Sequence, residues 1–167
     1  MSAGTLSLVK QYFRATVAGC STFRTLVGAA DAAAALNRVY RDVLPGPVDG
    51  KEYTLDELRG IRPYCLVWSE RMSETAIATG TFESTGIMVA RFVDDVPELL
   101  ENNPPEAVRQ FEETVSGIAE SMKALAGSAG YLNITGVDVQ PAGLGDETSF
   151  PSKGLVVVCE VSVTWDG

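Results

Sequence analysis

The most regular hydrophobic pattern lies near the end of the sequence, where apolar and polar positions alternate. One parity of residues 154–167 holds Leu155, Val157, Cys159, Val161, Val163 and Trp165. The other parity holds Glu160, Ser162, Thr164 and Asp166, together with Val156 and Val158. A period of two predicts a β-strand over residues 155–165 with one buried face. Such a strand would be about 40 Å long, so we expect a partner strand of similar length elsewhere in the chain.

The clearest helical pattern covers residues 104–126. Its apolar positions recur at steps of three and four residues, at Val108, Phe111, Val115, Ile118, Met122 and Leu125. A capping Asn103, two prolines that have no amide hydrogen and the acidic Glu106 form a start signal, and Gly127 ends the pattern. The spacing predicts an amphipathic helix that packs Phe111, Ile118 and Met122 against a sheet.

The hydrophobic patterns and capping residues in the first 45 residues predict three further helices. Residues 5–17 have an amphipathic pattern, Gly19 interrupts it, and a short second helix capped by Ser21 or Thr22 is expected to end at Gly28. Asp31 is placed to cap an alanine-rich helix that Pro45 stops. The predicted inner face of that helix holds Leu36, Val39, Tyr40 and Val43.

Residues 45–53 read as a loop. Thr54 and Glu57 after it have the spacing of a capping box, which fits one or two helical turns or a plain turn.

The central region is rich in β-branched and aromatic residues. Residues 64–68 predict a buried strand, and residues 70–74 a polar turn after it. Residues 75–93 then predict one long bent or bulged strand, or two strands that meet near residues 83–86. Because residues 87–90 are apolar without alternation, we expect them to be covered on both faces or to lie at a subunit boundary.

After the long helix, residues 132–139 predict a strand with a bulge at Gly136, and residues 141–153 predict a loop. The order of elements predicts an α+β fold with a mainly antiparallel sheet of long strands. Residues 75–93 and 155–165 would form its longest strands, covered by the N-terminal helices and the helix over 104–126. The length and the 46% hydrophobic content fit a single domain over residues 1–167. Without a signal-like start or an apolar run long enough for a membrane, the chain is expected to be soluble and unsecreted.

Charge narrows the possible functions. Thirteen basic against twenty-two acidic residues give a net charge of −9, opposite in sign to the basic surface that binds nucleic acid. The acidity serves solubility, or it forms a surface that repels another polyanion. The sequence has no histidine, which removes the triads and imidazole metal sites of most hydrolases.

The remaining candidate groups give no catalytic, cofactor-binding or metal site. The carboxylates cluster at Asp94, Asp95, Glu98 and Glu101, without the spacing of a calcium loop, so a solvated loop is the preferred interpretation. The three cysteines, Cys20, Cys65 and Cys159, predict reduced core thiols. Gly143 and Gly145 lack the third glycine of a dinucleotide fingerprint. The sequon of Asn133, Ile134 and Thr135 is read as a chance match in a strand.

Several segments follow one another in order over nearly the whole chain: FRTLVGAADAAAALNRVYRDVLP, LRGIRPYCLVW, ATGTFESTGIMVARF, the long helix and a last strand that ends in VSVTW. Together they resemble the tail terminator or tail-completion proteins of long-tailed bacteriophages. The most telling residues of this resemblance are Gly80, Thr81 and Phe82 followed by Ser84, Thr85 and Gly86, the stretch over 23–30, and Trp165. For residues 141–153 no counterpart is evident.

The resemblance implies a tail-terminator-like domain that forms a ring, usually a hexamer, at the head-proximal end of the tail tube in the virion. Its partners would be the tail tube protein and a neck or head-completion protein, and DNA would pass through without specific binding. Interface residues are expected among Ile87, Met88 and Val89. The bore would be lined by acidic side chains of residues 94–101 or of the outer face of residues 106–123.

Two other functions stay open from the sequence. One is a neck or head-tail connector subunit of similar fold. The other is a small-molecule-binding or carboxylate-based enzymatic α+β domain with an apolar pocket between helix and sheet. The state of assembly separates them, because a ring with an acidic channel favours a tail or neck protein and a monomer with a ligand-sized pocket favours the other.

Overall fold

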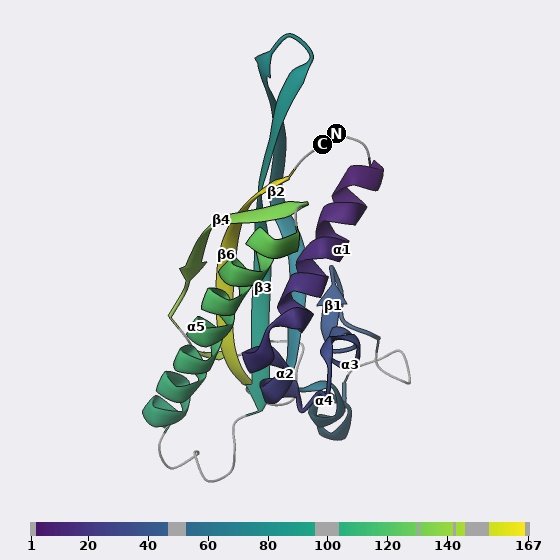
Figure 1. Cartoon of the computed structure of the whole chain (residues 1–167). Helices are drawn as coiled ribbons and strands as arrows, with labels where there is room; N and C mark the ends of the chain where they lie inside the picture. The colour runs from purple at the N-terminus through teal and green to yellow at the C-terminus, as the bar shows by residue number, and fades with distance from the viewer. Residues whose placement is uncertain are drawn as a thin grey trace.

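A computed structural model describes residues 3–46, 53–95, 104–129, 131–141, 143–145 and 154–165. The fold is α+β, as predicted, with a six-stranded sheet in the order β1-β2-β3-β6-β4 and β5 beside β6 (Figure 1). The strands are β1 (Val39–Arg41), β2 (Tyr64–Ala78), β3 (Thr81–Asp95), β4 (Leu132–Val139), β5 (Gly143–Gly145) and β6 (Gly154–Trp165). The helices are α1 (Ala3–Gly19), α2 (Ser21–Val27), α3 (Ala32–Leu36), α4 (Leu55–Ile61) and α5 (Pro104–Ala129). Among the described helices, none is long and apolar enough to cross a membrane.

The alternating pattern over residues 155–165 forms β6, near the centre of the sheet. Its predicted partner is β3, and the two strands pair antiparallel from Ser84 opposite Trp165 to Asp95 opposite Gly154. The apolar parity of β6 is buried in the core with Met88, Ala90 and Phe92 of β3. Helices α1, α2 and α5 cover this face of the sheet (Figure 1). The sheet is antiparallel except where β1 runs parallel to β2.

Helix α5 confirms the predicted long helix and extends three residues beyond the predicted end. The side chains of Phe111, Val115, Ile118 and Met122 are buried, which places the predicted face on the core. Leu125 near the end of the helix is 37% exposed, so the apolar face leaves the core there.

The break between α1 and α2 falls at Gly19, as predicted, and Gly28 ends α2 with a φ of 66°. The prediction that Ser21 or Thr22 caps α2 is wrong. Cys20 occupies the N-cap position, and no side-chain hydrogen bond caps the helix.

The caps predicted at Asp31 and Thr54 are confirmed, whereas Asn103, the predicted cap of α5, lies outside the described residues. Asp31 Oδ1 accepts a hydrogen bond from the Ala34 amide at 2.8 Å. Thr54 and Glu57 form a complete capping box at the start of α4.

The alanine-rich helix is shorter than predicted, and its predicted inner face is wrong. Helix α3 ends at Leu36, and Val39 and Tyr40 belong to β1, which pairs with Cys65, Leu66 and Val67 of β2. Val39 is fully buried in the core, whereas Val43 is 73% exposed. Sheet pairing supplies backbone hydrogen bonds here and overrides the local helical spacing.

The prediction for the central strands also needs correction. Residues 70–74 do not form a turn, because β2 runs unbroken through them to Ala78. The chain reverses at Thr79 and Gly80 instead, and β3 starts at Thr81, so residues 75–93 are parts of two strands joined by a tight turn. Gly80 has a φ of 77°, a conformation that glycine adopts without steric cost.

The predicted bulge in β4 is confirmed, because the pairing with β6 shifts register between Ile134 and Gly136. The predicted loop over residues 141–153 is wrong in part. It contains the short strand β5, which pairs with β6 from Gly143 opposite Val156 to Gly145 opposite Gly154.

Candidate functional site

The carboxylate cluster begins at the end of β3, where its two described members, Asp94 and Asp95, make contacts within the fold. Arg62 caps the C-terminus of α4, and its Nη1 donates to Asp95 Oδ1 at 2.8 Å. The Arg62 side chain is 2% exposed. Asp94 Oδ1 accepts from the Asp95 amide at 2.8 Å, and burial raises the pKa of the Asp94 carboxyl. The ion pair between Arg62 and Asp95 joins the end of α4 to the end of β3.

Nothing in the described part of the chain brings a third metal ligand to these two aspartates. No group of three or more cysteine or carboxylate side chains suited to a metal ion occurs among the described residues. Glu98 and Glu101, the other two members of the predicted cluster, lie outside the described residues.

The three cysteines are buried and free, as predicted. Burial raises the pKa of Cys20 to about 12 and of Cys159 to about 12, and it raises the pKa of Cys65 well above its usual value. A thiol attacks as its thiolate, so these groups are poor nucleophiles at neutral pH.

The glycine pair and the sequon lie in strands. Gly143 and Gly145 belong to β5, and the next described element after them is the strand β6. A dinucleotide loop needs a helix at that position. Asn133 and Thr135 lie in β4, where Thr135 Oγ1 donates to the Ser162 carbonyl oxygen at 3.2 Å.

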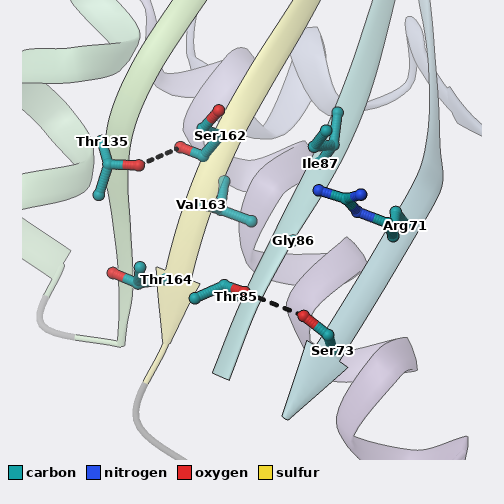
Figure 2. A pocket seen from close by; sticks show the side chains of 9 residues that line it. All are labelled: Arg71, Ser73, Thr85, Gly86, Ile87, Thr135, Ser162, Val163 and Thr164. Carbon is teal, nitrogen blue, oxygen red and sulfur yellow. Dashed lines mark hydrogen bonds between the residues drawn. The ribbon is translucent and has the colours of Figure 1, made fainter. Parts of the chain in front are cut away.

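A shallow hollow of about 200 Å³ lies on the sheet face turned away from α1 (Figure 2). It is lined by Arg71, Ser73, Thr85, Gly86, Ile87, Thr135, Ser162, Val163 and Thr164. Ser73 and Thr85 share a hydrogen bond of 3.1 Å across it. Small-molecule pockets are usually larger and mostly apolar, at about 300–1,000 Å³. The hollow therefore differs from the apolar pocket between helix and sheet that a ligand-binding domain would need.

The most distinctive surface feature is a two-stranded extension of β2 and β3, which we call the hairpin arm and define as residues 74–83. β3 pairs with both β2 and β6 as far as Ser84, which lies opposite Trp165 of β6. Between Ser84 and the turn, the described pairing of β3 is with β2. Every residue of the arm is exposed. The arm projects from the body of the sheet (Figure 1).

Two large apolar side chains are exposed near the tip of the arm. Ile77 is 63% exposed and Phe82 is 62% exposed. A two-stranded hairpin is marginally stable at best in water, and full burial of each such side chain stabilises by about 1.5–3 kcal/mol. The arm therefore adds little to the core of its own chain and leaves two large apolar side chains exposed.

The predicted interface residues lie near the base of the arm, but two of them cannot form an interface. Met88 is fully buried in the core under the helices, and Val89 is 3% exposed. Ile87 remains partly exposed and lines the hollow. The large exposed apolar side chains of this region are instead Ile77 and Phe82, several residues away from the predicted interface residues.

The outer face of α5 is acidic, as predicted. Glu106, Glu113 and Glu120 are at least 36% exposed in their side chains and pair with bases one turn away. Arg109 lies between Glu106 and Glu113, and its hydrogen bond lowers the pKa of Glu106 to about 2. Lys123 Nζ donates to Glu120 Oε1 at 2.8 Å. These pairs are exposed and leave a net negative helix surface.

No protein-family model matches the chain. No curated protein matches its sequence. One of the solved structures similar to it is a chain from the virion of a native gene transfer agent (GTA) particle. The match has a TM-score of 0.42 and 14% sequence identity, and it covers 95% of this chain and 97% of that chain. Both the TM-score and the identity are too low to establish a common fold.

Proposed function

We propose that the protein is a structural subunit of a long-tailed phage-like virion. Its copies close into a ring, a hexamer by the sequence resemblance, at the head-proximal end of the tail tube. There the ring ends tube polymerisation and joins the tail to the neck or head. The resemblance to tail terminator proteins over nearly the whole sequence supports this role.

The hairpin arm is the observation that carries the assembly part of the proposal. Ten consecutive exposed residues, with Ile77 and Phe82 among the most exposed large apolar side chains, are a poor arrangement for a chain that acts alone. A ring subunit has a use for such an arm, because closed rings are built from contacts between two different surfaces of the same chain.

The proposed path of DNA follows from charge. A net charge of −9 per copy repels phosphates, so an acidic bore lets DNA pass without retaining it. The bore candidates remain the acids of residues 94–101, of which Asp94 and Asp95 at the end of β3 are described, and the acids on the outer face of α5.

The proposal includes no catalysis, no cofactor and no required metal. It rests on a sequence without histidine and on buried thiols with raised pKa values. We expect a chelator to leave the melting temperature unchanged. A fall of several degrees that a divalent cation reverses would contradict this part.

The test of the role is a particle assembled without this protein. Overlong or headless tails are expected, and supplying the wild-type chain in trans should restore normal particles. Tails of normal length that fail to join heads would point to the neck connector instead. Tails of normal length joined to heads would refute both roles.

A further inference from the structure

We propose that the hollow on the sheet face turned away from α1 binds one carboxylate group, supplied by an aspartate or glutamate side chain of a neighbouring subunit in the particle. The site itself is made by residues of a single chain. The inference deepens the proposed function and rests on it only for the source of the carboxylate.

The hollow is formed where short side chains meet on neighbouring strands. Two rows cross the sheet there, each with one residue from β2, one from β3 and one from β6: Arg71, Ile87 and Ser162, and then Ser73, Thr85 and Thr164. Five of the nine lining residues carry a hydroxyl group, and none of the nine is acidic. Figure 2 shows the Arg71 guanidinium pointing from β2 toward β3, beside Ile87.

The polar groups around the hollow include hydrogen-bond donors that have no acceptor in the described part of their own chain. Among the described residues, the Arg71 side chain makes no ion pair or hydrogen bond, and the hydroxyls of Ser162 and Thr164 make no hydrogen bond. Ser73 and Thr85 share one hydrogen bond of 3.1 Å, which leaves one of their two hydroxyl hydrogens available. A guanidinium has five donors and no acceptor. The hollow therefore fits an anion with more than one acceptor oxygen.

Charge favours a single carboxylate over the phosphates of DNA. Glu83 lies two residues from Thr85 on β3, and Glu160 lies two residues from Ser162 on β6, so both side chains are on the same sheet face as the hollow. DNA would meet these acids and the net charge of −9 with a whole row of phosphates. A carboxylate brings one charge, and it matches the paired donors of one guanidinium.

The shape of the hollow favours a carboxylate that is attached to a protein surface. Pockets for free small molecules have volumes of about 300–1,000 Å³ and bury most of the ligand. The hollow is shallow, measures about 200 Å³ and lies on an open sheet face. A side chain that a bound subunit presents has already lost most of its freedom of movement, so a shallow site with few contacts is enough to hold it.

The site is tested first in the purified chain, with sodium acetate as the probe. Nuclear magnetic resonance follows the Nε–H signal of Arg71 while acetate replaces chloride at constant ionic strength. Arg59 is the internal control, because it is also exposed and without a partner among the described residues but lies on α4, outside the hollow. We expect the Arg71 signal to shift in a saturable way and the Arg59 signal to stay nearly constant. Equal responses of the two signals would overturn the site.

Variants test whether the lining residues hold the acetate. Arg71→Gln removes the charge and should weaken acetate binding roughly tenfold or more, as followed by the Gly86 amide signal. Ser162→Ala should weaken it several-fold, and Arg59→Gln should not change it. All three residues are exposed, so the melting temperature should stay the same. An Arg71→Gln chain that binds acetate as well as the wild type would contradict the proposal.

Coupling in assembled tails tests the source of the carboxylate. Arg71→Lys places a primary amine at the hollow, and a water-soluble carbodiimide joins an amine to a carboxylate that touches it. Coupled chains are separated on a denaturing gel, which excludes coupling within one chain, and mass spectrometry then identifies the joined peptides. The matched control is Arg59→Lys.

We expect Arg71→Lys to couple to an aspartate or glutamate of another chain at least several-fold more than Arg59→Lys does. Equal coupling would overturn a protein side chain as the occupant. An absence of coupling at both positions would also overturn it and would leave a free acid or a DNA phosphate as the source. The acetate titration needs no tails, so the site and the proposed function can fail separately.

Discussion

At the scale of single residues, Gly86 lets β2 and β6 pack closely against β3 near the base of the hairpin arm. It pairs with Met72 on one side and Val163 on the other. A Cβ at this position would overlap Met72 Sδ, and it would lie 2.9 Å from the Arg71 carbonyl oxygen and 3.3 Å from the Trp165 ring. The Met72 side chain can move aside, but the backbone of β2 has to shift.

We therefore expect Gly86→Ala to lower the free energy of unfolding by about 1–3 kcal/mol, measured by chemical denaturation. Gly60→Ala is the matched control, because Gly60 lies in α4 and has open space around its Cβ position. The control should be neutral or stabilise the protein by up to about 1 kcal/mol. An equal response of the two variants would contradict the close packing at Gly86.

At the scale of elements, α5 is the helix whose burial stabilises the sheet most directly. Ile118 is fully buried in the core cluster. Ile118→Asp places an unpaired carboxylate there, and we expect a loss of roughly 3–5 kcal/mol in unfolding free energy. Ile118→Val removes one methylene and should cost about 1 kcal/mol. An unchanged denaturation midpoint for Ile118→Asp would show that this face of α5 does not pack on the sheet.

The same elements show what could be predicted from the sequence. The strand β6 and helix α5 each bury one face, so the sequence shows their periodicity. In β6 the buried residues, such as Cys159 and Val161, are two positions apart, and in α5 the buried Ile118 and Met122 are four positions apart. Every residue of the hairpin arm is exposed, so its strands carry no such pattern, and the polar residues 70–74, which lead into the arm, resemble a turn. Gly80 is the available signal for the turn, but a glycine in a β-rich segment is equally typical of a bulge within one strand.

The candidate site was harder to predict than the fold, for a related reason. Asp94 and Asp95 were found from their sequence cluster, but the role of Asp95 depends on Arg62, which is 33 residues away. The stacking of Tyr12 on Tyr131 is likewise a product of tertiary packing. An exposed apolar residue such as Phe82 is indistinguishable in sequence from a core residue until the strand pairing is known.

At the scale of the whole molecule, the net charge of −9 predicts that the protein does not bind DNA. Binding without sequence preference requires basic side chains that displace counterions from phosphates. We expect the purified protein to leave the gel mobility of double-stranded DNA unchanged even at low salt. A complex that forms and weakens with added salt would contradict the repulsive role of the charge.

Two charge-reversal variants test whether α5 lines the proposed bore. Glu120→Lys on the outer face of α5 and Glu70→Lys on β2 each change the net charge from −9 to −7 at an exposed position. Exposed ion pairs are worth about 1 kcal/mol or less, so neither change should affect folding much. If α5 faces the bore, Glu120→Lys puts a cation on the path of the DNA and slows its release from particles several-fold, whereas Glu70→Lys does not. Equal release rates for the two variants would exclude this part of α5 from the bore and leave the acids near the end of β3 as the candidates.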